Sequence, residues 1–162
     1  MTTLAIAHFY HPFAHIRNTG ASPESRQLQA QLEKLFRHFR GRGERLRAIG
    51  ELDEAYSQGR ADNWDEYGAQ SVSKETYVTA FRFLEALPSA VPSPEISLDP
   101  DGEINFEWNN AGKIFSASIG ETGVLSYAGV FGTNLTAHGT EIFDDTIPEA
   151  IIQNIKRLGY QF

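Results

Sequence analysis

The sequence contains no cysteine among its 162 residues. Disulfide bonds, thiolate zinc sites and cysteine nucleophiles are therefore excluded, and a metal site would need nitrogen or oxygen ligands. The sequence also lacks an apolar run of about 18 residues, the length that crosses a bilayer as a helix. Since the N-terminal segment has no leading basic residues either, we expect no signal peptide and a cytoplasmic location.

The composition is that of a globular protein. Hydrophobic residues make up 41% of the chain and charged residues 22%, unlike the polar and highly charged composition of disordered chains. The length suits one domain with a substantial core. We expect a single domain over residues 1–162, with a mainly helical half (1–87), a proline-rich connection (88–94) and an antiparallel sheet plus a C-terminal helix (95–162).

The helical half begins with a capping signal, because Ser22 precedes Pro23 and an acidic residue. The apolar residues that follow recur at spacings of three and four, which predicts a helical stripe facing a core: Leu28, Leu32, Leu35, Phe36 and Phe39. Gly41 and Gly43 interrupt this pattern, which resumes toward Gly59. We therefore expect two helices or one kinked helix in this region.

A further helix is predicted after a polar stretch, with Ser73 as its N-cap and Pro88 closing it. One face of this helix would carry the following apolar residues: Tyr77, Ala80, Phe81 and Leu84. The prolines of the segment LPSAVPSPE then mark an extended connection. Beyond it, the period of the apolar residues changes from the helical spacing to strand alternation.

Four strands are predicted, separated by the turn sequences DPDG, NNAG and GETG. They cover residues 95–98, 103–108, 113–119 and 124–131. The last segment has Asp145 or Thr146 as a cap, Pro148 in the first turn and isoleucines at helical spacing, so it predicts a helix that packs on the sheet. The expected fold is α+β: a helical half, a four-stranded antiparallel meander and a C-terminal helix.

The net charge of −7 hides two halves of opposite sign. Residues 1–60 hold nine Lys or Arg and six Asp or Glu, whereas residues 61–162 hold five and fifteen, a balance of −10. Such an acidic half can steer association with a basic partner. The sequence therefore favours a protein-interaction function.

The segment NWDEYGA provides a candidate protein-binding site through Trp64, Asp65, Glu66 and Tyr67. Large amphipathic rings beside acidic groups are enriched at interfaces. Aromatic rings in loops are nevertheless buried on average, and we expect Trp64 and Tyr67 to fold inward and seal the helical half against the sheet. Both alternatives stay open for these residues.

Paired carboxylates occur at Glu103 and Glu107, on alternate positions of one predicted strand. They share the face opposite Ile104 and Phe106, so we interpret them as part of a polar solvent face that extends the acidic binding surface. Glycosidase chemistry would need two carboxylates across a cleft, and one strand does not provide a cleft. Phosphate-binding glycine loops and nucleophile-elbow motifs are absent from the sequence.

The arginine-rich segment RHFRGRGERLR is the single basic patch of the chain, with Arg37, Arg40, Arg42, Arg45 and Arg47. It offers an alternative function, nucleic-acid binding through phosphate contacts. A sequence pI near 5.2 opposes binding of the whole molecule to a polyanion. We expect these arginines to form salt bridges, within the chain or in a dimer.

Three histidines occur within eight positions, at His8, His11 and His15. With a carboxylate from elsewhere they could hold zinc, iron or manganese, which gives a second alternative, a metal-dependent enzyme. Pro12 weakens a common helical face for the three imidazoles. We expect packing or surface residues here, and no cofactor.

We therefore predict a cytoplasmic, non-catalytic α+β interaction protein. Its acidic surface would mask a basic surface of a partner protein, as an inhibitor, an antitoxin-like protein or a phage counter-defence protein does. Nucleic acid is not the expected partner, a membrane is excluded as one, and a homodimer is left open.

Overall fold

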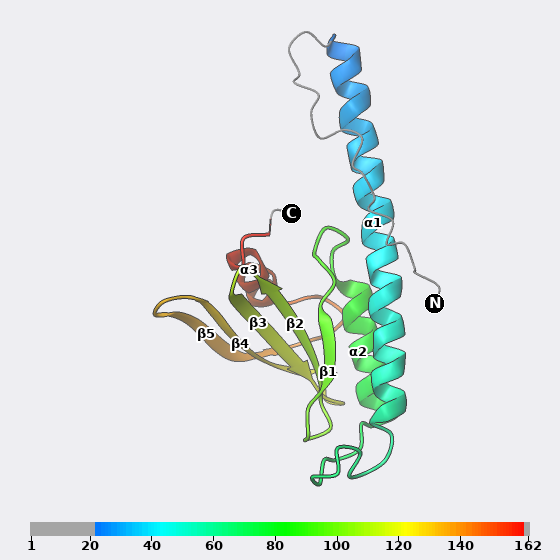
Figure 1. Cartoon of the computed structure of the whole chain (residues 1–162), viewed down its shortest axis with the longest axis vertical. Coiled ribbons are helices and arrows are strands. Elements are labelled where there is room, and N and C mark those ends of the chain that lie inside the picture. Colours follow the sequence, from blue (N-terminus) through cyan, green and yellow to red (C-terminus); the bar gives the residue numbers. More distant parts are fainter. Residues whose placement is uncertain (1–21, 161–162) are drawn as a thin grey trace, which may run out of the picture. The chain divides into compact units, whose positions relative to one another are not determined.

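The computed structural model describes residues 22–160, and within them all side chains except those of Glu24, Ser25, Lys34 and residues 37–40. Contacts divide the chain into two compact units, Met1–Lys34 and Leu35–Phe162. The elements of the second unit are shown in Figure 1 with the labels used below. The expected single domain over residues 1–162 stays a prediction.

Helix α1 spans Pro23–Gln58, so its start is the predicted one. The backbone N–H of Arg26 donates to the carbonyl of Ser22 at 3.1 Å, which closes the first turn. The helix continues through Gly41 and Gly43 instead of breaking into two. Glycine costs a helix about 1 kcal/mol relative to alanine, so neighbouring good helix formers can carry a helix across it.

The predicted apolar stripe of α1 does not face a core, which corrects the sequence expectation. In the first unit Leu28 is 58% exposed and Leu32 is also exposed, and in the second unit Phe36 is 62% exposed and Leu35 is exposed. Spacing identifies an amphipathic helix but does not say whether anything covers its apolar face. The side chain of Phe39 lies outside the described part of the chain.

Helix α2 spans Lys74–Ala86. Ser73 is its N-cap as predicted, because its hydroxyl oxygen accepts from the backbone N–H of Thr76 at 3.0 Å. Ala80 and Leu84 are buried as expected, but Phe83 is also fully buried and Tyr77 is only half-buried. The ring of Tyr77 stacks on that of Tyr56 at 4.6 Å, and this contact joins α2 to the C-terminal part of α1.

The sheet has five antiparallel strands in the order β1-β2-β3-β4-β5, one more than predicted. The strands span Glu95–Leu98 (β1), Ile104–Asn110 (β2), Lys113–Ile119 (β3), Val124–Gly132 (β4) and Leu135–Ile142 (β5). Each strand pairs with the next in sequence, so the predicted meander is confirmed and extended.

Strand β5 escaped prediction because its sequence, LTAHGTEI, has a glycine in its interior and apolar residues only at its ends and at Ala137. Contacts with β4 stabilise this strand, although its sequence has no alternating apolar pattern. The ring of Tyr127 on β4 lies over Gly139, where a Cβ atom would come within 2.6 Å of the Tyr127 hydroxyl oxygen. A glycine is therefore required at this point for the ring to cover the edge strand.

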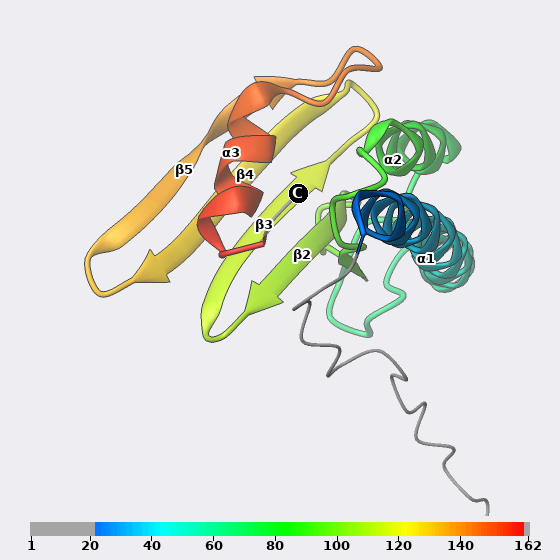
Figure 2. The ribbon, with the colours of Figure 1, turned by 90° about the horizontal axis from the view of Figure 1, so that it is seen from above.

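One face of the sheet forms the core with the helices. The alternating residues of β2 and β3 are buried as predicted: Ile104, Phe106, Trp108, Phe115, Ala117 and Ile119. The Phe83 ring of α2 stacks on Phe106 at 4.7 Å between ring centroids. Figure 2 shows α2 and α3 against the sheet, with β5 at the edge away from α2. The opposite sheet face carries serines, threonines and His138.

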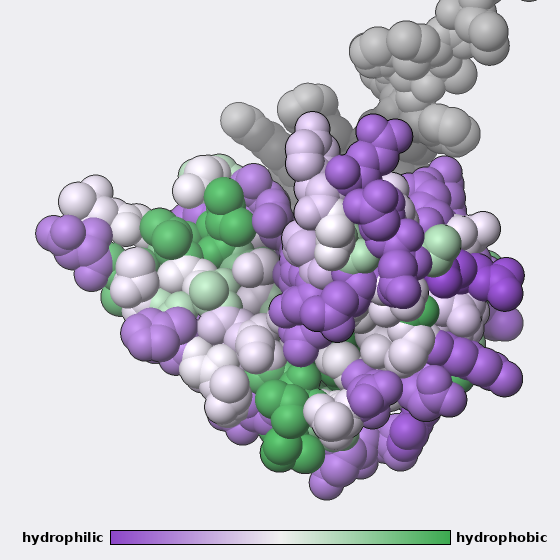
Figure 3. Space-filling model, turned by 90° about the horizontal axis from the view of Figure 1, so that it is seen from below, coloured by the Kyte–Doolittle hydropathy of each residue, from purple (hydrophilic) through white to green (hydrophobic). Residues whose placement is uncertain are grey.

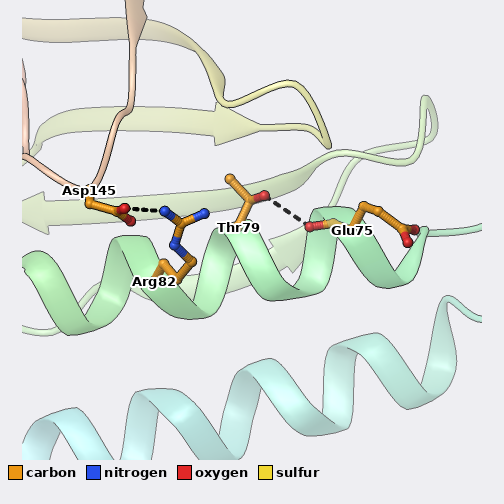
Figure 4. A network of polar contacts seen from close by, with 4 residues as sticks. All are labelled: Glu75, Thr79, Arg82 and Asp145. Atoms are coloured by element: carbon orange, nitrogen blue, oxygen red, sulfur yellow. Dashed lines mark hydrogen bonds and ion pairs between the residues drawn. The ribbon is translucent and has the colours of Figure 1, made fainter.

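Helix α3 spans Glu149–Arg157, and Ile151 and Ile155 bury its inner face against β3 and β4. The predicted caps were wrong, since Pro148 is the N-cap residue and no side chain caps the helix. Asp145, with φ of 71°, forms an ion pair with Arg82 of α2 instead. Figure 4 shows this pair beside the bond from the Thr79 hydroxyl to the Glu75 carbonyl at 2.9 Å.

A search of the described helices finds none with the length and apolar character to cross a membrane.

Candidate functional site

The loop between α1 and α2 projects Tyr67 into solvent. Tyr67 is 93% exposed, the highest value among the large hydrophobic residues that the structure describes. The expectation that this ring folds inward is therefore wrong. A tyrosine at a loop tip loses little side-chain entropy on binding and offers both an apolar ring and a hydroxyl, which makes it a typical interface anchor.

Short side chains within the loop hold the backbone around Tyr67. The Oδ1 atom of Asp65 accepts from the backbone N–H of Tyr67 at 2.8 Å and from that of Ala69 at 3.0 Å. The Oδ1 atom of Asn63 accepts from the N–H of Gly68 at 2.7 Å. Aspartate and asparagine favour such bonds because their side chains reach backbone groups a few residues ahead.

The loop is also closed by bonds between its two ends. The N–H of Asn63 donates to the carbonyl of Ala69 at 2.6 Å, and the Trp64 indole N–H donates to the carbonyl of Gln70 at 3.0 Å. Trp64 is half-buried and, among the described residues, is not one of the side chains that pack against the core, so the expectation that it seals the helical half against the sheet is not met. The indole N–H thus helps to close the loop, while Tyr67 stays exposed to solvent.

Two residues other than glycine adopt positive φ in this loop, Asn63 at 60° and Glu66 at 66°. Asparagine tolerates this region, whereas glutamate rarely adopts it, so the hydrogen bonds around Glu66 determine its conformation. Gly68 follows with φ of 98°. Unfavourable backbone conformations of this kind persist where the surroundings over-determine them, and they are frequent at binding sites.

The hydrogen bonds of the loop shift the acidity of its aspartates. The hydroxyl and the backbone N–H of Ser71 donate to Asp62 and lower the pKa of that carboxyl group. The backbone N–H groups of Tyr67 and Ala69 lower the pKa of Asp65 in the same way. Because donated hydrogen bonds favour the charged form, both carboxylates are ionised at neutral pH.

The turn between β1 and β2 packs against this loop. The N–H of Gln70 donates to the carbonyl of Pro100 at 2.8 Å. Gly102, with φ of 86°, allows the approach, since a Cβ atom there would lie 3.0 Å from the carbonyl oxygen of Ser71. We call residues 62–71 and 99–103 together the acidic loop end. It contains six Asp or Glu and no Lys or Arg.

The acidic loop end has a hydrophilic surface. Figure 3 views the molecule from the side on which this loop lies in Figure 1, and hydrophilic residues (purple) cover much of this side, beside separate hydrophobic patches (green). The sequence had singled out Trp64 to Tyr67 and Glu103, and the structure brings them into one region. It had not singled out Asp62, Asp99 or Asp101, although the DPDG turn signal contains the last two.

Among the residues the structure describes, one group offers converging carboxylates: Asp99, Asp101 and Glu103, with oxygens within 4.8 Å of one another. Burial raises the pKa of Asp99, and the charges of Asp101 and Glu103 raise it further. Oxygen ligands of this kind suit Mg²⁺ or Ca²⁺, but exposed acidic groups of this kind are common without a bound ion. The cluster therefore serves here as a source of negative charge.

Glu103 and Glu107 have different neighbours. The Oε2 atom of Glu103 accepts from the Ser118 hydroxyl at 2.6 Å, which holds this carboxylate beside the turn. Glu107 lies further along β2, where it is paired in register with Glu95 and Ser116. Both are half-buried on the sheet face opposite the core. Glu103 therefore belongs to the acidic loop end, whereas Glu107 does not.

The arginine patch is divided among different roles. Arg45 donates to the carbonyl of Leu87, and Arg47 forms an ion pair with Glu51 on the same helix. The expected salt bridge is thus observed for Arg47, with a partner in its own helix and not in the acidic half. Arg42 is exposed. The side chains of Arg37 and Arg40 lie outside the described part of the structure.

The histidine cluster at His8, His11 and His15 lies outside the described residues. Of the described histidines, His138 occupies a shallow depression of about 530 Å³ on the open sheet face, together with Ser116, Ser118 and Ser126. Within the described residues, no hydrogen bond joins His138 to a serine. The depression therefore does not show the nucleophile and base pair that covalent catalysis requires.

Comparison of the chain with family models, with curated proteins and with solved structures finds no match.

Proposed function

We propose that the protein is a non-catalytic interaction module whose acidic loop end binds a basic surface of a partner protein. The observation that carries this proposal is the exposure of Tyr67 on a loop that its own hydrogen bonds hold in shape. A binding loop that is already ordered loses less entropy on association, so more of its contact energy contributes to affinity.

Charge supports a basic partner over a neutral one. The carboxylates of the acidic loop end lie close together, and like charges held together favour a nearby cation. Lysine and arginine side chains of a partner would supply that cation, while the Tyr67 ring would pack against their aliphatic stems or stack on a guanidinium. Such a surface suits an inhibitor, an antitoxin-like protein or a phage counter-defence protein, which masks a cationic site. A cytoplasmic location fits these roles and remains part of the proposal.

The experiment compares partners captured by the tagged full chain and by two variants, Tyr67→Ala and Glu66→Gln. The proposal expects a basic partner whose affinity falls about tenfold or more with Tyr67→Ala, as for a central anchor residue. It also expects a smaller loss with Glu66→Gln and weaker binding at high salt. Glu54→Gln, an exposed carboxylate on α1, is the matched control and should bind as the wild type does.

Two results would contradict the proposal. One is a captured partner whose affinity is the same for wild type, Tyr67→Ala and Glu66→Gln. The other is a complex that is insensitive to salt. The alternatives, nucleic-acid binding through Arg37–Arg47 and a metal-dependent enzyme built on His8, His11 and His15, stay predictions of the sequence.

A further inference from the structure

A groove separate from the acidic loop end lies between α1 on one side and the C-terminal end of α2 with the segment that follows it on the other. It has a volume of about 380 Å³. Its walls come from α1 on one side and from Glu85 and Ser89 on the other, and the α1 residues are Gly41, Arg42, Arg45, Leu46 and Ile49. Its size is at the lower end of the range for binding pockets, enough for one or two side chains of a ligand.

Backbone contacts form this groove. Gly41 allows α1 to approach the segment after α2 closely, because a Cβ atom at this position would collide with the backbone carbonyl of Ser89. Close by, the Arg45 guanidinium donates to the backbone carbonyl of Leu87. Both walls are thus fixed without a ligand, so the groove is available before binding.

The lining combines apolar and charged groups in a small space. Leu46 is 65% exposed and Ile49 is half-buried, so an apolar surface faces the solvent here. Arg42 and Arg45 supply positive charge beside it, and Glu85 supplies one negative charge. An exposed leucine that shares a groove with two arginines is a complementary surface for an apolar side chain that has a carboxylate nearby.

We propose that this groove binds an acidic, apolar peptide segment of a partner protein, with an apolar side chain on Leu46 and Ile49 and a carboxylate on Arg42. Charge complementarity selects this occupant. A second copy docking through the same face would bring Arg42, Arg45 and Arg47 against their own equivalents. A nucleic acid carries a charge on every nucleotide and would set several phosphates against the Glu85 carboxylate and the net charge of −7 of the chain, whereas a peptide segment can place a single carboxylate on Arg42.

The experiment selects a phage-displayed random 12-residue peptide library on the full chain, with counter-selection on the variant Arg42→Glu. The enriched peptides are synthesised, and their affinities are measured by fluorescence polarisation. The proposal expects sequences in which Leu, Ile or Phe lies within a helical turn of Asp or Glu. Their Kd should rise about tenfold or more with Arg42→Glu and with Leu46→Glu. Lys74→Glu, a charge reversal at an exposed site outside the groove, should leave Kd unchanged.

Circular dichroism of each variant confirms that it is folded before its affinity is measured. The proposal is overturned if no peptide is enriched, if the enriched peptides lack acidic residues, or if folded Arg42→Glu and Leu46→Glu variants bind as wild type does. It is also overturned if a labelled 20-nucleotide oligouridine binds and Arg42→Glu abolishes that binding while no peptide binds. Tyr67→Ala should leave peptide affinity unchanged, so this test is independent of the acidic loop end.

Discussion

The loop of residues 62–71 and the groove beside Gly41 differ in the sequence separation of the residues that hold them together. The loop is built from local contacts, because most of its hydrogen bonds join residues no more than nine positions apart, such as Asp62 and Ser71. The groove is built from residues about forty positions apart, such as Arg45 and Leu87. The comparison teaches that local bonds can fix the conformation of residues 62–71, whereas the other part of the acidic loop end, residues 99–103, and the groove are in place only after distant elements have packed.

The largest expected effect comes from Phe83, which lies in the core where α2 packs against the sheet. Its ring stacks on Phe106 and meets the edge of Phe143 at 5.5 Å, and it is fully buried. Phe83→Ala should lower the free energy of unfolding by about 3–5 kcal/mol, because it leaves a cavity in the core. Urea denaturation measures this loss.

The exposed Val78 of the same helix is the control, and Val78→Ala should change stability by less than about 0.5 kcal/mol. Equal effects of the two substitutions would contradict the position of Phe83 at the centre of the core.

A second prediction compares two glycines of α1, Gly41 in the groove and Gly43 outside it. Gly41→Ala should lower the free energy of unfolding by about 1–3 kcal/mol, because the new methyl group pushes α1 away from Ser89. Gly43→Ala should instead raise it by up to about 1 kcal/mol, since no neighbouring atom in the described part of the chain lies within 4 Å of the added methyl group and alanine favours the helix. Thermal denaturation measures the stability of both variants. A Gly41→Ala variant that is more stable than wild type would contradict the close contact between α1 and the Ser89 carbonyl.

A third prediction concerns the charge of the acidic loop end. Because the pKa of Asp99 is raised on folding, the folded state holds the Asp99 proton more tightly than the unfolded state does. The free energy of unfolding should therefore fall as pH rises from 3.8, the ordinary aspartate pKa, through the raised pKa of Asp99, because the folded state disfavours the ionised carboxylate. Asp99→Asn should be more stable than wild type at pH 7, and the two should converge below pH 3.8. Urea denaturation at several pH values measures this difference. An Asp99→Asn variant that is less stable than wild type at pH 7 would contradict the prediction.

The smallest effect is expected for Arg82→Ala. The ion pair of Arg82 with Asp145 is about half exposed on both sides and links α2 to the connection between β5 and α3 (Figure 4). Solvent and salt screen such a pair, so its removal should cost at most about 1 kcal/mol and less at high salt. Guanidinium chloride would mask this dependence, so urea at two salt concentrations is the suitable measurement. A loss several times larger would show that this contact organises the fold.

Local signals made much of the fold predictable. The start of α1 at Pro23, the Ser73 cap, the buried alternation of β2 and β3 and the turn at DPDG all depend on residues close in sequence. Strand β5 was not predictable, because its polar residues become a strand only through pairing with β4. The exposure of Leu28 and Phe36 was not predictable either, since spacing defines an apolar face without its partner.

The same distinction applies to the sites. The sequence identified Trp64 to Tyr67 as an unusual string, but the direction of the Tyr67 ring depends on the bonds that Asn63 and Asp65 make after folding. Asp99 and Asp101 are brought to this loop by a tertiary contact between Gln70 and Pro100. Glu85 and Ser89 gave no signal in the sequence as groove residues, because no short motif joins them to Arg42.

The central claim is that the acidic loop end is an ordered surface that presents Tyr67 before any partner binds. Amide hydrogen exchange followed by NMR tests it directly. The account predicts slow exchange for the N–H groups of Tyr67, Gly68, Ala69 and Ser71, which donate to side chains of the loop, and faster exchange of Tyr67 and Ala69 in Asp65→Ala. Exchange of these amides at the rate of an unstructured peptide in the wild type would contradict it.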